Sequence, residues 1–217
     1  MKSLSFSTIL ICLIFSCGPR EKVSKEVFEE VNKNMEVKRL LEVDILDEAM
    51  IWGDSISIQA QNNLIANLQK AIEEGGLENA ISYCNVNASK IVEEGLNNPE
   101  INIRRVSTKN RNPSNKPDED EAPILDAYAY NVENNLQTDP SIQKIEDGEV
   151  YLYTKAIIFP GGICQNCHGD PTSEVSLGVQ EVLKEKYPTD RALGFKKGDL
   201  RGMWSIRIPK KEVVKRL

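Results

Sequence analysis

The stretch Cys164-Gln165-Asn166-Cys167-His168 decides how this chain must fold, because it has the spacing of a c-type haem attachment site. Two thiols two residues apart add across the two vinyl groups of one porphyrin and form two thioether bonds. The histidine that follows then reaches the iron and becomes an axial ligand. His168 is the only histidine among the 217 residues. We therefore predict one covalently bound haem c.

Three other interpretations of this motif are a disulfide, a zinc half-site and a thioredoxin-like redox pair. A zinc site would need two more suitable ligands, and the chain has no second histidine. A thioredoxin motif opens a helix inside a βαβ unit, whereas this motif follows the turn Pro160-Gly161-Gly162. We expect that turn to let the backbone approach the macrocycle closely. The haem interpretation is therefore the favoured one.

Residues 1–16 are predicted to be a lipoprotein signal peptide. Lys2 supplies a positive start, and the apolar stretch Ile9–Phe15 is too short to span a bilayer. The sequence Ile14-Phe15-Ser16-Cys17 resembles a bacterial lipobox, which implies acylation of Cys17 after cleavage. Several acyl chains give stable anchoring where one would be marginal. The alternative is an ordinary signal peptide with a chance cysteine, but no small-x-small cleavage site follows.

We therefore expect a protein of the bacterial cell envelope, anchored by lipid through Cys17. Gly18 favours the outer membrane, facing the periplasm. Residues 17–39 are charged and are expected to form a tether. Export agrees with the haem motif, because cytochrome c maturation takes place outside the cytoplasm. The formal net charge of −6 makes nucleic acid a poor candidate partner, so the expected partners are the membrane and a redox or signalling protein.

Hydrophobic patterning predicts an α+β domain over residues 40–217. Helices are expected over residues 40–74, 77–94, 118–136 and 173–187, with Gly75-Gly76 separating the first two. Strands are expected over residues 101–107, 142–145, 149–159 and 203–208, and at Phe195. Residues 108–117 are expected to form a loop, and Asp147-Gly148 to turn a hairpin.

The second helix carries an unassigned cysteine on its apolar stripe. That stripe comprises Leu77, Ile81, Cys84, Ala88 and Ile91. A low-spin haem needs a second axial ligand, and the candidates are Met35, Met50, Met203 and Cys84. A lone inward-facing cysteine is most often a small core residue. The residues by themselves therefore leave the second ligand open.

Several segments occur together in one order, and their combination resembles a known family. The segments are Arg104-Arg105-Val106-Ser107, Arg111-Asn112-Pro113-Ser114-Asn115-Lys116-Pro117-Asp118, the haem motif with Gly169, and Ala192-Leu193-Gly194-Phe195-Lys196-Lys197-Gly198-Asp199-Leu200-Arg201-Gly202. They are similar to the PAS-like c-type haem domain family, first described as a domain of unknown function. Its members are sensor input domains of membrane kinases and stand-alone exported single-haem proteins. The resemblance covers about residues 40–210.

This resemblance implies a PAS-like antiparallel sheet with an N-terminal helical region. It also implies iron ligation by the motif histidine and by a cysteine thiolate from the early helix. The segment Ala80–Ala88 matches the family's cysteine segment, so Cys84 inherits the ligand role. One departure is Glu119-Asp120-Glu121, where relatives often carry an aromatic residue before the acidic one.

Basic residues are candidates for contacts with the haem propionates. Arg105, Arg111 and Arg201 are the strongest, since a guanidinium fork matches a carboxylate, and Lys197 is a further candidate. The alternative for each is a solvated loop or strand charge.

Two hypotheses of different classes follow. In the first, the protein is a mono-haem cytochrome that carries electrons in the envelope. In the second, it is a haem sensor in which a redox change, or CO or NO, displaces Cys84. No output domain follows the last expected strand before Leu217, which favours the carrier, or a sensor that signals through a separate partner. A peroxidase-like enzyme would need a distal acid-base group, and none is identifiable, so we expect no enzymatic activity.

Overall fold

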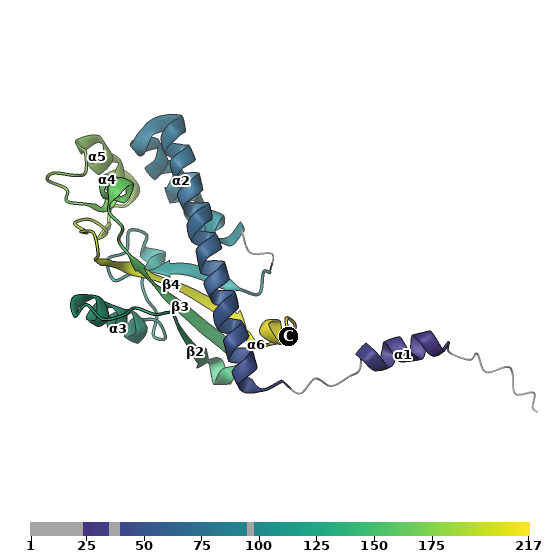
Figure 1. Ribbon diagram of the computed structural model, residues 1–217. Helices are drawn as coiled ribbons and strands as arrows, with labels where there is room; N and C mark the ends of the chain where they lie inside the picture. Colours follow the sequence, from purple (N-terminus) through teal and green to yellow (C-terminus); the bar gives the residue numbers. More distant parts are fainter. Residues whose placement is uncertain (1–23, 35–39, 95–97) are drawn as a thin grey trace, which may run out of the picture. The chain divides into compact units, whose positions relative to one another are not determined.

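The computed structural model describes residues 24–34, 40–94 and 98–217. The predicted signal peptide and Cys17 lie outside these ranges. Contacts divide the chain into two units, Met1–Arg39 and Leu40–Leu217. Helix α1, Lys25–Asn34, belongs to the first unit, and every other described element belongs to the second (Figure 1). Within the described ranges, no helix has the length and apolar character needed to cross a membrane.

The second unit is built on a four-stranded antiparallel sheet. Its strands are β1, Asn102–Val106; β2, Ser141–Ile145; β3, Val150–Ile158; and β4, Leu200–Pro209. Their order is β1-β4-β3-β2, so the last strand lies between the first and the third (Figure 1). The hairpin predicted around Asp147-Gly148 joins β2 to β3. The long connection from β3 to β4 carries the haem motif.

The helices surround this sheet. They are α2, Glu42–Glu94; α3, Ala122–Glu133; α4, Gln165–His168; α5, Leu177–Lys186; and α6, Lys210–Val214, with short 3-10 turns at Pro113–Asn115, Glu146–Gly148 and Gly162–Cys164. Helix α2 is two helices joined at a break, because Gly75 and Gly76 leave the helical conformation. Gly76 has a φ of 78°, which glycine adopts without a steric penalty. The predicted break is confirmed.

Two expectations about local structure were wrong, and one helix was missed. The helix expected from residue 118 begins at Ala122, because Asp118 Oδ1 accepts the backbone N–H groups of Asp120 and Glu121 and closes a turn first. Phe195 is not in a strand, since its N–H donates to the His168 carbonyl at 2.9 Å instead of to the sheet. Helix α6 was not predicted, because five residues are too few to show a helical period.

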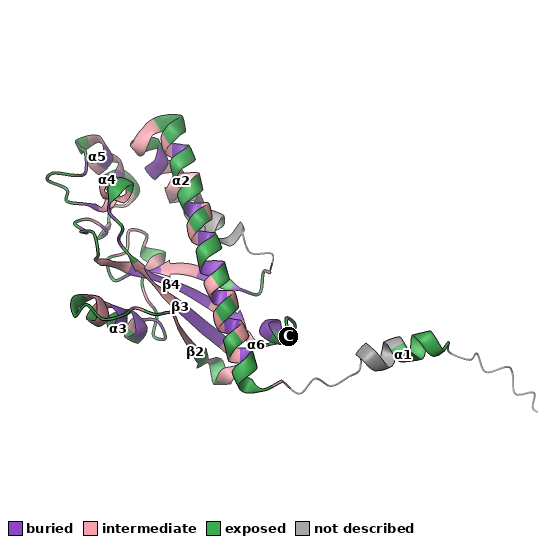
Figure 2. Cartoon of the chain, viewed as in Figure 1, coloured by how far each residue is buried: buried purple, intermediate pink, exposed green. Residues whose placement is uncertain are grey.

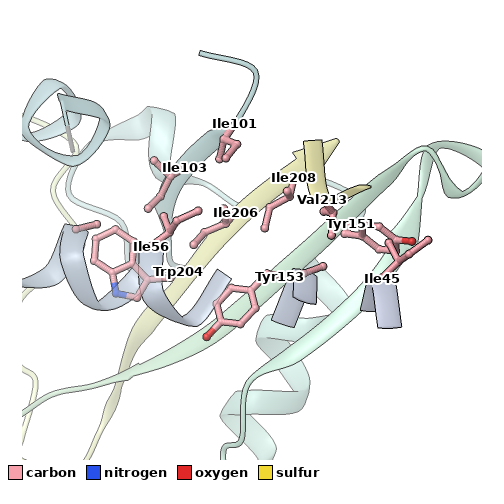
Figure 3. Packing of buried hydrophobic residues seen from close by; sticks show 12 residues of the cluster. Ile45, Ile56, Ile101, Ile103, Tyr151, Tyr153, Trp204, Ile206, Ile208 and Val213 are labelled. Carbon is pink, nitrogen blue, oxygen red and sulfur yellow. The ribbon is translucent and has the colours of Figure 1, made fainter. Parts of the chain in front are cut away.

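The largest core cluster lies between α2 and the sheet. Ile56 of α2 packs with Tyr153 of β3 and with Trp204 and Ile206 of β4 (Figure 3). Figure 2 shows the buried residues concentrated on β3 and β4 where α2 crosses them. The α+β fold class is therefore confirmed, and the alternation of side chains along each strand decides which of them face α2.

The opposite face of the sheet packs against α3. Its apolar cluster comprises Val106, Ile124, Leu125, Tyr128, Leu152 and Met203. Beside it lies the fully buried carboxylate of Glu121. This carboxylate accepts hydrogen bonds from Arg104 Nε at 3.0 Å and from Ser205 Oγ at 2.6 Å. Strand alternation therefore separates two adjacent arginines: Arg104 turns to α3, and Arg105 turns to the face that α2 covers.

We predict that Glu42→Gln lowers the stability of the fold at neutral pH and makes that stability depend less on acid pH. Glu42 begins α2 and pairs with Lys144 at 2.7 Å and Lys210 at 3.1 Å, and it accepts the Tyr151 hydroxyl at 3.0 Å. These partners lower the pKa of Glu42 from 4.5 to about 2. A carboxyl with a lowered pKa in the folded state stabilises that state above its unfolded pKa, and this contribution is lost as the pH falls towards 2.

Melting temperatures of wild type and variant, measured from neutral pH down to the acid limit, check this prediction. The difference should be largest near neutral pH and should shrink as the pH falls below about 4.5. Asp47→Asn, at an exposed carboxylate of the same helix, is the control. Equal melting curves for Glu42→Gln and wild type at neutral pH would contradict it.

Candidate functional site

A cavity of about 800 Å³ lies between α2, strands β1 and β4, and the β3–β4 connection. Its apolar lining includes Leu68, Ile72, Leu77, Ile81, Phe159, Ile163 and Trp204. Both halves of α2 contribute to it, on either side of the Gly75-Gly76 break. The sheet therefore forms one wall, and α2 and the motif segment close over it.

The residues of the haem motif line this cavity together. Cys164 ends a 3-10 turn, and Cys167 and His168 follow in the single turn of α4. Cys164 and Cys167 are free, half-buried thiols. Burial raises the pKa of both thiols, and the charge of Arg111 opposes that rise at Cys167. One compact turn thus presents both sulfur atoms and the imidazole to one space.

His168 is held in a defined tautomer. Its Nδ1 lies 2.8 Å from the backbone carbonyl oxygen of Ala192, which only accepts, so Nδ1 carries the proton. Phe159 and Phe195 flank the ring edge-on, each with its centroid 6.4 Å away. Burial, reinforced by the charges of Arg111 and Arg201, lowers the pKa of His168 well below 6.5. The ring is therefore neutral, and Nε2 keeps the lone pair that a metal ligand needs.

Cys84 lies in the same cavity, on the second half of α2. Burial raises the pKa of this thiol, and the charges of Arg105 and Arg111 oppose that rise. The other candidate ligands lie elsewhere. Met50 packs against the core under α2, Met203 is buried against α3, and Met35 falls outside the described residues.

The three predicted arginines, Arg105, Arg111 and Arg201, all line the cavity, whereas Lys197 does not. Burial and the mutual repulsion of the arginines lower the pKa of Arg105, and lower that of Arg201 from 12.5 to about 9. Arg201 lies 5.1 Å over the Phe195 ring. Among the described residues that line the cavity there is no Asp or Glu. The cavity thus combines apolar walls with several positive charges, of which Arg111 is paired with Asp190 at 2.9 Å.

This donor set fits a haem. An apolar space suits the macrocycle, cationic forks suit its two carboxylates, and a neutral imidazole and a thiol that line the same cavity suit the iron. Sequence reasoning missed other parts of the site, namely Tyr187, Asp190 and the Ala192 carbonyl. The role of a backbone carbonyl cannot be predicted from the identity of its side chain. The sequence indicates only that Asp190 lies in a loop, and the fold is what brings it to Arg111.

Comparison with known proteins identifies the family. The model of the Tll0287-like proteins, described as Tll0287, matches residues 21–209. The chain belongs to the Tll0287-like family. A crystal structure of the cyanobacterial heme-protein Tll0287 matches with a TM-score of 0.53 and 27% sequence identity, covering 71% of this chain and 91% of that one. No curated protein matches the chain significantly. Membership of the Tll0287-like family confirms the resemblance drawn from the sequence segments.

Proposed function

We propose that this chain binds one haem c and acts as an exported mono-haem cytochrome. The proposal rests on one observation: the haem motif, the Cys84 thiol and a cluster of arginines line the same cavity. Among the described residues that line it there is no Asp or Glu. The related structure of a heme-protein supports it. Bound haem supplies a one-electron redox centre.

Each residue of the cavity has a role in this proposal. Cys164 and Cys167 would form the thioethers, and His168, with its ring fixed by Ala192, would offer Nε2 to the iron. Cys84 would be the second iron ligand. Arg105 and Arg201 would hold the propionates, whose negative charge would offset the repulsion between the two guanidinium groups.

We further propose that the protein transfers electrons in the cell envelope, held there by lipid on Cys17. The lipobox-like segment and the need of haem c for export support this. A second function, sensing of redox state or of CO or NO, is favoured by one feature of the fold. Cys84 lies beyond the Gly75-Gly76 break, so its half of α2 is joined to the first half by a non-helical link.

Spectra of the purified protein distinguish these functions. Absorption and EPR spectra of the oxidised form, and absorption of the reduced form with and without CO, report the ligands in each state. A carrier keeps both axial ligands in both states and excludes CO. A sensor loses one ligand on reduction and binds CO with a Soret shift.

We predict that the haem is covalently attached through Cys164 and Cys167. Acid-acetone extraction should leave the colour on the polypeptide, because thioether bonds survive acid. The pyridine haemochrome should have the band position of a haem with two thioethers. Cys164→Ser and Cys167→Ser should each shift that band to the single-thioether position. Extractable haem in the wild type, made with intact maturation machinery, would contradict the prediction.

We predict that Cys17→Ala releases the protein from the membrane fraction. Without the thiol, no lipid is attached, and the chain should accumulate as an unprocessed precursor or a soluble form. Fractionation with detection of the mature protein measures this, with Cys12→Ala as the control inside the predicted signal peptide. If Cys17→Ala sediments with membranes as wild type does, the lipobox interpretation is wrong.

A further inference from the structure

The segment 190–195 lies along the haem motif and is bonded to it through the backbone. The Gly194 N–H donates to the Gly169 carbonyl and the Phe195 N–H donates to the His168 carbonyl, each at 2.9 Å. Between these contacts and Asp190, the Ala192 carbonyl accepts from His168 Nδ1 at 2.8 Å. The orientation of the imidazole therefore depends on where this one peptide group is held.

Two side chains hold that peptide group. Arg111 Nε donates to Asp190 Oδ2 at 2.9 Å, and one of its terminal nitrogens donates to the Cys167 carbonyl at 2.5 Å and to the Ala192 carbonyl at 3.3 Å. Asp190 Oδ1 accepts the Ala192 N–H at 2.8 Å. The two side chains are 13% and 8% exposed, so water screens this pair poorly.

We propose that Arg111 and Asp190 are positioning residues that fix the orientation and the Nδ1 hydrogen bond of His168. This inference rests on the proposed function, in which His168 is an axial ligand. The partner of the second ring nitrogen of a ligating histidine fixes its tautomer and tunes its basicity. Arg111 and Asp190 control that partner, Ala192, from both sides. Arg111 thereby acts through Asp190 and the backbone, because Nε donates to Asp190 and one terminal nitrogen donates to the Cys167 and Ala192 carbonyls. These contacts take the place of the propionate contact that its residue type predicts.

A lysine at position 111 cannot reproduce the hydrogen bonds that Arg111 makes to Asp190, Cys167 and Ala192. A guanidinium presents several donors in a rigid plane, whereas an ammonium is a single compact charge on a flexible stem. Arg111→Lys therefore keeps the positive charge near the haem and removes the fork. If the proton exchange or the EPR signal associated with His168 changes in this variant, the cause is the lost hydrogen-bond geometry, because the net charge is unchanged. Asp190→Asn is a second, milder variant, since an amide oxygen still accepts the Ala192 N–H.

The sole histidine makes the test direct. Labelling the full-length holoprotein with ¹⁵N-histidine gives signals from His168 alone. The exchange rate of its Nδ1 proton is measured in the reduced protein, with CO added where needed to keep the iron low-spin. EPR of the oxidised protein is recorded beside it. The control is Arg207→Lys, which disturbs an ion pair with Asp118 at 3.0 Å outside the cavity.

We expect Arg111→Lys to accelerate Nδ1 proton exchange by about tenfold, the factor that corresponds to loss of one hydrogen bond of ordinary strength. Its ferric EPR signal should shift or split into more than one low-spin species. Asp190→Asn should change both observables in the same direction and by less. Arg207→Lys should lower the melting temperature and leave both observables as in wild type.

An Arg111→Lys protein that melts earlier but keeps the wild-type exchange rate and EPR signal would overturn the proposal, because Arg111 would then only stabilise the fold. The same result for Asp190→Asn, should Arg111→Lys fail to accumulate, overturns it equally. The haemochrome of wild type separates this from the proposed function. A wild type without thioether-bound haem overturns both, whereas an unchanged His168 in a haem-loaded variant overturns the positioning role only.

Discussion

Replacing Cys84 with serine is expected to raise the reduction potential and to abolish the thiolate features of the ferric low-spin EPR spectrum. A thiolate donates negative charge and favours Fe(III), so its loss favours the reduced state. The covalent haem should stay attached, because Cys164 and Cys167 are unchanged. Among the described methionines and cysteines other than the motif pair, Cys84 is the residue that lines the cavity.

The same charge argument predicts that the strength of the bond between Cys84 and the iron depends on the oxidation state of the iron. On reduction the iron loses charge, and a buried anionic sulfur becomes more costly to keep unprotonated. Under the sensing function, reduced wild type should then release Cys84 and bind CO, whereas under electron transfer it should keep Cys84 bound and exclude CO. Reduced Cys84→Ser should bind CO more readily, because no thiolate competes with CO for the iron.

Met50→Leu and Met203→Leu are matched controls, since both residues were candidate ligands and both lie in core clusters. Each should leave the potential and the EPR spectrum as in wild type. If Cys84→Ser matches wild type in both measurements, Cys84 is a core residue. A change in either methionine variant would then identify the true ligand, and the sensing function would lose its mechanism.

The second large effect is expected from Glu121→Gln, which should destabilise the fold by about 1.5–3 kcal/mol, the usual contribution of a hydrogen bond to a charged group. Glu121 is fully buried, and its carboxylate also accepts the Asp118 N–H at 3.0 Å. Without its charge, the half-buried guanidinium of Arg104 loses its counter-ion. Domains are stable by about 5–15 kcal/mol in total, so this change removes a large share.

Urea unfolding of the haem-loaded protein, followed by circular dichroism, measures this loss. Glu119→Gln is the matched control, because Glu119 is an exposed residue of the same turn. The control should unfold at the wild-type midpoint, while Glu121→Gln unfolds at a lower urea concentration with little change in haem absorption. Coincident midpoints for the two variants would show that the Glu121 pair contributes no net stability.

The amino-acid sequence predicted most of the architecture because local signals there were strong. Gly75-Gly76 predicted the end of a helix, because glycine has a low helix propensity. Asp147-Gly148 predicted the turn of a hairpin, because it lies between two segments in which apolar and polar residues alternate. Boundaries were less accurate where side chains capped the backbone, as Asp118 does before α3. Phe195 shows the limit of periodicity, because an apolar residue between turns is equally compatible with a short strand and with an extended segment bonded to a loop.

For the site, the sequence by itself determined which chemistry is present, namely two thiols and an imidazole at haem spacing, a spare cysteine on the apolar stripe of a helix, and the candidate arginines Arg105, Arg111 and Arg201. Only the tertiary structure decided which of these meet. It placed Cys84 in the cavity and Met203 on the other side of the sheet, and it turned Arg104 to Glu121 and Arg111 to Asp190. The physical reason is that spacing along the chain fixes only neighbours within a few residues, whereas the strand order β1-β4-β3-β2 brings residues 84, 105, 168 and 201 to one cavity through long-range packing.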